Sequence, residues 1–396
     1  LDKKPIMKAS IDDGYRLLAA GYFRKQAKQL ADQLDGVCEA EDIEHVHRAR
    51  VASRRLRAAM KLLGGWVPRK QGKRWRKELR RITEELGDAR DKDVQIEFLC
   101  KAFSAVEEPA CCPGIAHVLM HLEYQREVFQ PRVVEAADRL RASGVLGQMR
   151  NVAEKVLWEL GKREGGVRSP GIIAHVSRHI LRRLQRLLSY QDSLEDTDDQ
   201  GRHHQMRIAA KRLRYTLEIS KPVYEGQLDE TITAVKKVQT LLGEIHDCDV
   251  WVAHLDAFLE EERRRMAACF GSPRPFTRVK VGLEHLQRNR RQARRAVFEE
   301  LVDYWRVLRG QQIWKKLTGT VRGDAGPDAE QGEPSDLPEP PALAVGKSAE
   351  DRENGNGEEP NRDFEQTRHL HPPHATEATL RRATASPAVG QGTVGE

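Results

Sequence analysis

The chain of 396 residues contains an internal repeat, which constrains its fold more than any other feature of the sequence. Residues 47–60 return as residues 204–217, and each copy carries basic residues three, seven, eight and ten positions after its first residue, a histidine. A second pair of matching segments, 86–94 and 242–250, follows the two copies at nearly equal distances. The repeated unit is therefore long, and we expect it to contain at least two helices.

Both copies have the spacing of an amphipathic helix, since about 100° separates successive residues. The basic rows, which we name the first stripe and the second stripe, consist of His47, Arg50, Arg54, Arg57 and Lys61, and of His204, Arg207, Lys211 and Arg214. The residues opposite them are Ala49, Ala52, Leu56, Met60 and Leu63, and Met206, Ala209, Leu213 and Leu217. Each copy is thus predicted to pack one face and to present a charged row on the other.

A row of like charges along one helix is unfavourable, because neighbours four residues apart repel each other. A solvated face usually mixes acidic with basic residues, whereas both stripes place only basic or titratable groups at the same four positions. Recurrence therefore favours an anion-binding face over a solvated one. The stripes differ at one point, because Glu218 stands where Lys61 stands in the first copy.

Composition favours helices, with 39% hydrophobic, 32% charged and 6% aromatic residues. The glycine-rich segment 161–171 is the expected junction between a first repeat of about residues 8–160 and a second of about 172–317. Residues 318–396 are rich in small and acidic residues, and we expect an acidic, disordered tail there. That tail contains 7 basic and 15 acidic residues, so residues 1–317 carry a net charge of +15 and should attract polyanions.

Each repeat is expected to hold further helices that carry basic residues. In the first repeat we expect helices over 11–34, 73–85 and 91–103, with an interruption at Leu86-Gly87. In the second we expect helices over 172–188, 230–242 and 250–268. Their candidate ligand-binding residues are Arg24, Lys28, Arg80, Arg81, Arg178, Arg182, Lys236 and Lys237.

No stretch approaches 18 uncharged apolar residues, and residues 1–20 lack the apolar core of a signal peptide. We therefore expect a cytoplasmic protein without a membrane partner. The six cysteines have no framework spacing, which predicts reduced thiols. For the adjacent Cys111 and Cys112, incidental or buried thiols are favoured over a redox pair.

The two pairs of motifs resemble those of the conserved histidine α-helical domain, or CHAD domain. The first copy shows this as His47-x-x-Arg50-Val51-Ala52-x-Arg54-Arg55-Leu56-Arg57 with Leu86-Gly87-x-x-Arg90-Asp91. The second shows it as His204-x-x-Arg207-Ile208-Ala209-x-Lys211-Arg212-Leu213-Arg214 with Leu242-Gly243-x-x-x-Asp247. The resemblance covers about residues 8–317, and the second copy departs from it at His246, which stands where Arg90 stands.

This resemblance implies an all-α fold of two helical bundles related by a pseudo-twofold axis. It also implies that the His/Arg helices line a basic central cavity, which binds inorganic polyphosphate through the stripes and the further basic residues named above. Polyphosphate granules or their proteins are the expected partners and location, and the expected protein is a binder and not an enzyme, with no cofactor or metal. His47 and His204 are either phosphate donors, whose protonated form the ligand would favour, or packing residues.

Two other functions remain open from the residues alone. A basic helical surface also attracts nucleic acid, although the stripes add only Tyr215 as a stacking aromatic. A metal-dependent phosphohydrolase could use the carboxylates of Asp91 and Asp93, and of Asp247 and Asp249, to hold Mg²⁺. Those carboxylates are otherwise expected to neutralise basic side chains or to cap a helix.

Histidines at helical spacing offer further metal candidates, with surface or core positions favoured over metal ligation. These are the pairs His117 and His121, and His175 and His179, together with His369, His371 and His374 of the tail.

Overall fold

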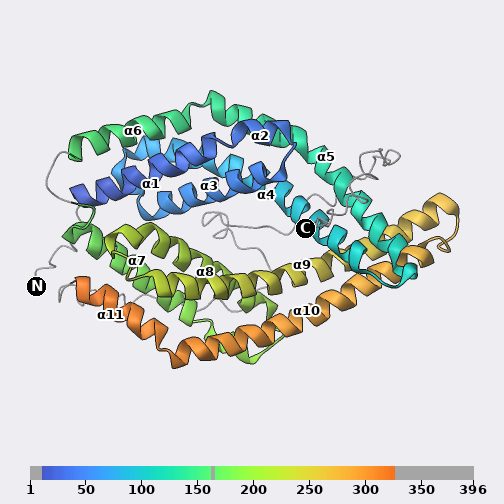
Figure 1. The fold of residues 1–396 in the computed structure, drawn as a ribbon. Coiled ribbons are helices and arrows are strands. Elements are labelled where there is room, and N and C mark those ends of the chain that lie inside the picture. The colour runs from blue at the N-terminus through green and yellow to red at the C-terminus, as the bar shows by residue number, and fades with distance from the viewer. Residues whose placement is uncertain (1–10, 162–165, 326–396) are drawn as a thin grey trace, which may run out of the picture. The chain divides into compact units, whose positions relative to one another are not determined.

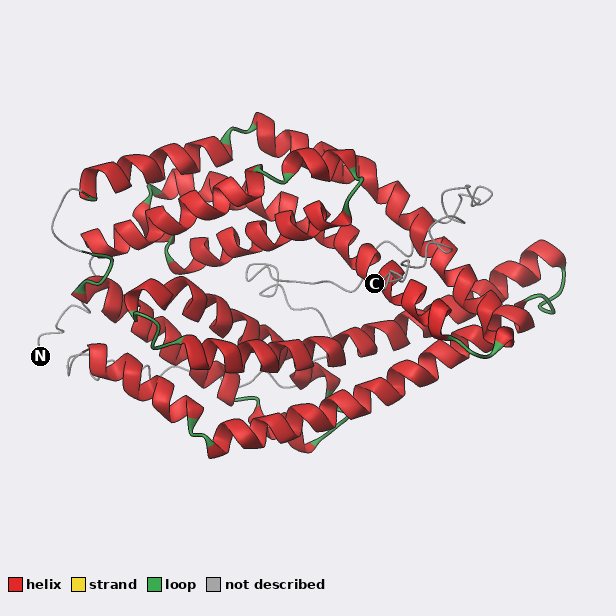
Figure 2. Cartoon of the chain, viewed as in Figure 1, coloured by secondary structure: helices red, strands yellow, loops and turns green. Residues whose placement is uncertain are grey.

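The regular structure of the chain is helical. The computed structural model describes residues 11–161 and 166–325, and within these residues Figure 2 shows helices and loops but no strand. The predicted all-α fold is confirmed. The described residues belong to one compact unit, residues 1–329.

We refer to residues 11–161 as the first half and to residues 166–325 as the second half (Figure 1). The first half contains α1 (Asp13–Ala31), α2 (Leu34–Glu39), α3 (Ile43–Leu62), α4 (Arg69–Ala105), α5 (Cys112–Ala142) and α6 (Val145–Leu160). The second contains α7 (Pro170–Leu188), α8 (Gln200–Ser220), α9 (Asp229–Phe270), α10 (Phe276–Gly310) and α11 (Ile313–Ala325).

Helices pair in the same combinations in the two halves. Helix α3 packs on α4 as α8 packs on α9, and α4 packs on α5 as α9 packs on α10. Helix α1 contacts α6 as α7 contacts α11, so the stripe helices α3 and α8 lie in comparable surroundings. A pseudo-twofold relation between the halves stays a prediction.

The predicted interruption at Leu86-Gly87 and the predicted break between the helices 230–242 and 250–268 are wrong, because α4 and α9 are continuous helices of 37 and 42 residues. Gly87 and Gly243 have ordinary negative φ, and the leucines before them, Leu86 and Leu242, are at most 1% exposed. A glycine inside a helix costs about 1 kcal/mol, while burial of one leucine side chain contributes roughly 1.5–3 kcal/mol. Burial of these leucines in the core therefore keeps each helix continuous at its glycine.

Buried residues of both halves form one contiguous hydrophobic core. In the first half, Phe23 of α1 packs with Trp66 and Trp75 at ring-centroid distances of 5.3 and 6.3 Å. In the second half, Trp305 of α10 packs with Trp314 of α11 at 5.4 Å. The halves also meet through contacts of α3 with α8, of α1 with α7 and of α5 with α10.

Helix α11 corrects the predicted start of the tail. We expected disorder from Thr318, but α11 extends to Ala325, and its Leu317 and Val321 are 2% and 0% exposed. Ser177 Oγ of α7 donates a hydrogen bond to the Val321 carbonyl at 3.3 Å. Apolar burial against α7 therefore extends the folded region, while the rest of the predicted tail, 326–396, lies outside the described residues.

Candidate anion-binding site

Both stripe helices begin at an aspartate from the acidic segment before them. The Asp42 carboxylate accepts the Glu44 N–H at 2.9 Å to start α3, and the Asp199 carboxylate accepts the Arg202 N–H at 3.0 Å to start α8. Such caps satisfy donors that a helix N-terminus otherwise leaves unpaired. The acidic segments thus fix where each stripe begins.

The predicted packing faces of both helices are confirmed. Every residue assigned to them is buried, including Leu56 and Leu213, which are both 0% exposed. Most of the basic residues opposite are half-buried, because α8 contacts α3, α7 and α9. Lys211 is only 7% exposed, so its expected place on an open charged face is wrong.

The first stripe faces residues of α4. Arg50 Nη2 lies 3.3 Å from Asp91 Oδ1, and the charges of Glu84 and Arg80 act on Arg57. Loss of hydration, followed by the positive charge of Arg90, holds the pKa of His47 below its ordinary value. The His47 ring therefore carries little charge at neutral pH unless an anion lies beside it.

The second stripe begins with a pair of histidines. His204 Nδ1 lies 3.2 Å from His246 Nδ1, and their ring centroids are 4.6 Å apart. One of these nitrogens must donate and the other accept, so at least one ring is neutral in this arrangement. The histidine at the head of each stripe thus has a different partner, an arginine in the first half and a histidine in the second.

The four candidate magnesium carboxylates lie within continuous helices, where residues two positions apart point about 200° apart. On α4, Asp91 pairs with Arg50, whereas Asp93 Oδ1 accepts Arg126 Nε of α5 at 2.7 Å. On α9, Asp249 Oδ1 accepts Arg294 Nε of α10 at 2.5 Å. The prediction that these carboxylates neutralise basic groups is confirmed for these three, and helix capping is wrong. This geometry disfavours a metal shared by either pair.

Four basic side chains meet where the end of α3 approaches α7 and α8. We name this group the cationic corner, and it consists of Arg57, Lys61, Arg183 and Arg212. Loss of hydration, followed by the charges of Arg212, Arg57 and Arg183, lowers the pKa of Lys61 to about 8. Loss of hydration and the Arg212 charge likewise lower the pKa of Arg183 to about 10.

Hydrogen bonds fix Arg183 of the cationic corner, whereas Lys61 and Arg212 are exposed. Arg183 Nη1 donates to the Arg212 carbonyl at 2.8 Å and also to Thr216 Oγ1, which ties α7 to α8. Within residues 11–161 and 166–325, no carboxylate forms an ion pair with Lys61, Arg183 or Arg212. The fold therefore brings like charges together, and an anion bound there would relieve their repulsion.

The repeat places a different group at the equivalent position of the other half. We name it the compensated corner, and it consists of Tyr22, Arg55, Arg214 and Glu218. The Glu218 carboxylate lies 3.9 Å from Arg55 Nη2 and 3.7 Å from Arg214 Nε. Positions 55 and 212 are equivalent in the repeat, as are 61 and 218. The two corners therefore differ by the exchange of Lys61 for Glu218, and also because the compensated corner contains Tyr22 where the cationic corner contains Arg183.

Several predicted ligand residues have acidic neighbours instead. Arg80 pairs with Glu84 at 2.7 Å, Arg81 with Glu78 at 3.6 Å, and Lys28 with Asp32 at 2.7 Å. Arg80 also lies beside the first stripe, since its charge acts on Arg57.

Lys237 has its partners on α10. It pairs with Glu300 at 3.2 Å and lies 4.5 Å from the Tyr304 ring centroid. These contacts turn Lys237 toward α10, and its role as a ligand-binding residue stays a prediction.

The remaining predicted residues, Arg24, Lys236, Arg178 and Arg182, are exposed. Arg182 acts on Arg183 of the cationic corner. Sequence reasoning omitted Arg55, Arg183 and Arg212 from the candidate site. The recurrence of a basic residue eight positions after each histidine was the signal that could have included Arg55 and Arg212.

Three of the four histidines in the predicted pairs form hydrogen bonds. His175 Nε2–H donates to the Leu62 carbonyl at 2.7 Å and so ties α7 to the end of α3, beside Lys61. His117 Nε2 lies 2.8 Å from Glu262 Oε2, and His121 Nε2 lies 2.8 Å from Gln125 Nε2. The tail histidines lie outside the described residues.

These features define an all-α protein in which two repeat-related helices bring basic side chains to the junction of its halves. The CHAD domain family model matches residues 21–256, more than half of the chain, and the chain belongs to this family. No curated protein matches it. Within the described helices, none has both the length and the apolar character that crossing a membrane requires.

Solved structures of similar fold include two with low sequence identity. The crystal structure of the CHAD domain from the plant Ricinus communis is 20% identical, with a TM-score of 0.49, and the match covers 72% of this chain and 91% of that chain. PptA from Streptomyces chartreusis is 17% identical, with a TM-score of 0.48, covering 73% and 98%.

Proposed function

We propose that this protein binds inorganic polyphosphate through its two stripes, with the cationic corner as the strongest part of the binding surface. The observation that carries the proposal is the grouping of Arg57, Arg183 and Arg212, from three helices, around Lys61. Loss of hydration, followed by the charges of neighbouring arginines, lowers the pKa values of Lys61 and Arg183, and a bound polyanion would offset the repulsion between these charges. Membership of the CHAD family supports the same ligand, because the motifs that identify the family carry the stripes.

Polyphosphate suits such a surface because it presents only negatively charged phosphate oxygens and has no bases that would require specific contacts. Arginine meets phosphate oxygens through its forked donors, and lysine contributes a point charge. Stripe residues recur at about 5.4 Å per helical turn, so successive turns can contact one extended chain. Recognition by charge alone requires no nucleophile and no metal, and the proposed activity is therefore binding, in a cytoplasmic protein that associates with polyphosphate granules.

The test is a binding titration of the full chain with long-chain polyphosphate over a range of salt, with and without excess RNA. Arg50→Glu/Arg207→Glu reverses one charge on each stripe and should abolish tight binding while the helical circular dichroism spectrum stays unchanged. Arg263→Glu/Arg278→Glu is the matched control, since it makes the same charge change at exposed positions of α9 and α10 and should bind normally. Equal losses in both variants would show that net charge alone binds the ligand.

RNA competition separates the proposal from nucleic-acid binding. Retention of polyphosphate in the presence of excess RNA supports the proposed function. Displacement by RNA at equal charge concentration would favour a general polyanion surface and contradict it. Since α11 extends past Thr318, the full chain is the appropriate protein for these measurements.

A further inference from the structure

A close crossing of backbones joins the two halves far from the stripes in sequence. Helix α5 begins at Cys112 and helix α10 at Phe276, and they approach through two glycines. A side-chain carbon at Gly114 would lie 2.9 Å from Gly282 Cα and overlap the Val279 carbonyl. One at Gly282 would overlap the Cys111 carbonyl, so the backbone of Cys111 is seated directly on α10.

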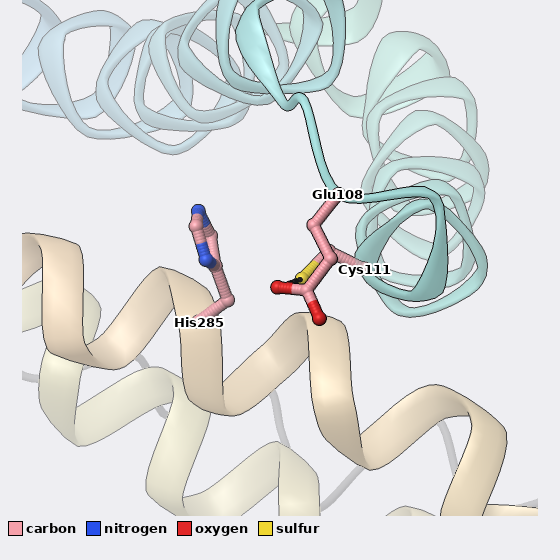
Figure 3. A group of neighbouring side chains, drawn as sticks. All are labelled: Glu108, Cys111 and His285. Atoms are coloured by element: carbon pink, nitrogen blue, oxygen red, sulfur yellow. Dashed lines mark hydrogen bonds between the residues drawn. The ribbon is translucent and has the colours of Figure 1, made fainter.

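The crossing gathers three side chains that carry metal-ligand atoms. Glu108 and Cys111 come from the connection between α4 and α5, and His285 comes from α10, one turn after Gly282 (Figure 3). One ligand atom from each of the three lies within 4.8 Å of the other two. Cys111 Sγ already lies 3.6 Å from Glu108 Oε2.

We infer that Glu108, Cys111 and His285 form a zinc site that links the two halves, which goes beyond the proposed polyphosphate binding. Thiolate, imidazole and carboxylate are together the ligand set that Zn²⁺ takes in proteins. Zinc bonds of 2.0–2.3 Å in a tetrahedron place ligand atoms about 3.5 Å apart. The observed spacing needs only a small rotation of side chains to reach that value.

The surroundings favour three protein ligands and one small ligand. Cys111 is buried, His285 is half-buried and Glu108 is exposed, so one side of the group is open to water. His285 also lines a cavity of about 250 Å³ between α4, α5 and α10. A water molecule from this side can take the fourth position, as in other three-ligand zinc sites.

Binding of zinc to this group should release a proton. Cys111 is buried, its thiol lies 3.6 Å from Glu108 Oε2, and the thiolate is the form that binds zinc. Zinc forms a bond to the sulfur and displaces the thiol proton to solvent, while the imidazole binds as the neutral form.

Cobalt(II) is the probe for this site in the full chain without polyphosphate, because a cobalt–thiolate bond gives a charge-transfer absorption band that histidine ligands alone do not give. Native protein should show this band with one equivalent of cobalt, lose it when one equivalent of zinc is added, and release about one proton per zinc. Zinc should also raise the midpoint of thermal unfolding, because binding favours the folded state.

Cys111→Ser and His285→Gln should each weaken zinc binding, measured against a chromogenic chelator, by at least about 100-fold. Cys112→Ser is the matched control, since it removes the adjacent thiol outside the group and should keep both the band and the affinity. His285→Gln keeps the thiol, so it tests the site even if the serine variant is poorly folded. Absence of the band in native protein, or native affinity in the two ligand variants, would overturn the inference.

Discussion

The cationic corner and the compensated corner are built from equivalent positions of the repeat and differ in electrostatics. In both, an arginine eight positions after the stripe histidine approaches the end of the other stripe helix, as Arg212 does toward Lys61 and Arg55 toward Glu218. The Glu218 carboxylate neutralises its neighbours, whereas the equivalent Lys61 lies among the positive charges of Arg212, Arg57 and Arg183. Helices that repeat in sequence can therefore keep the same packing and still differ in the charges that meet at their ends.

The largest expected effect concerns packing, which should be equivalent in α3 and α8 although the charges of the two corners differ. Leu56→Ala on α3 and Leu213→Ala on α8 each remove a fully buried side chain at matching positions. Each should lower the free energy of unfolding by about 2–5 kcal/mol, because of lost burial and the cavity left behind. Urea unfolding monitored by circular dichroism measures both. If the two losses in free energy of unfolding differ by more than about 2 kcal/mol, the two helices are not packed equivalently.

A direct comparison of the corners uses their two equivalent arginines. Arg212→Ala should weaken polyphosphate binding about 10-fold, or about 1.4 kcal/mol, because it removes an uncompensated cation. Arg55→Ala should weaken it less than about 2-fold, because Glu218 lies 3.9 Å from Arg55. Dissociation constants at one fixed salt concentration give the ratio. Equal losses would mean that the corners contribute alike.

The exchange of Lys61 for Glu218 can be tested by removing each charge with glutamine. Glu218→Gln should strengthen polyphosphate binding by about 3-fold, since Arg55 and Arg214 lose their acidic neighbour. Lys61→Gln should weaken binding by a similar factor. The same titration applies, with thermal unfolding as the control for folding. If both variants changed the affinity for polyphosphate in the same direction, the proposed electrostatic difference between the two corners would be contradicted.

The smallest effect is a pH dependence specific to the cationic corner. Lys61 has a pKa of about 8 without ligand, and a bound anion favours its charged form and raises that value. Affinity should therefore be full below pH 8 and fall by about 2-fold between pH 7 and 9, for a rise of roughly 0.4 pKa unit. Lys61→Arg, which stays protonated, should remove this fall. An unchanged pH profile in that variant would assign the titration to another group.

The stripe helices could be predicted from sequence because their packing depends on a local period. Ala49, Leu56 and Met60 of α3 recur at helical spacing, and all are buried. The same rule could not foresee that Lys211 is covered, because the helices that pack on α8 come from distant parts of the chain. Periodicity identifies the apolar face, and tertiary neighbours decide how much of the other face meets water.

Other contacts that the sequence did not predict share that cause. Lys237 interacts with Glu300, 63 residues further along the chain, and no local pattern encodes this pair. Arg183 joins the candidate site because α7 packs on α8, a contact that spacing alone does not give. The sequence indicates breaks near both Leu-Gly pairs because glycine weakens a helix locally, although burial of Leu86 and Leu242 outweighs that cost.

Because α4 is one continuous helix, the directions of all its side chains around the helix axis are fixed relative to one another. Asp91 faces Arg50 of α3, while residues near its C-terminus, such as Leu99 and Phe98, face the core and α9. Each inserted residue would rotate everything beyond it by about 100° and advance it by 1.5 Å. With no loop between these contacts to absorb a change in length, α4 should tolerate substitutions between Asp91 and Leu99 far better than insertions or deletions.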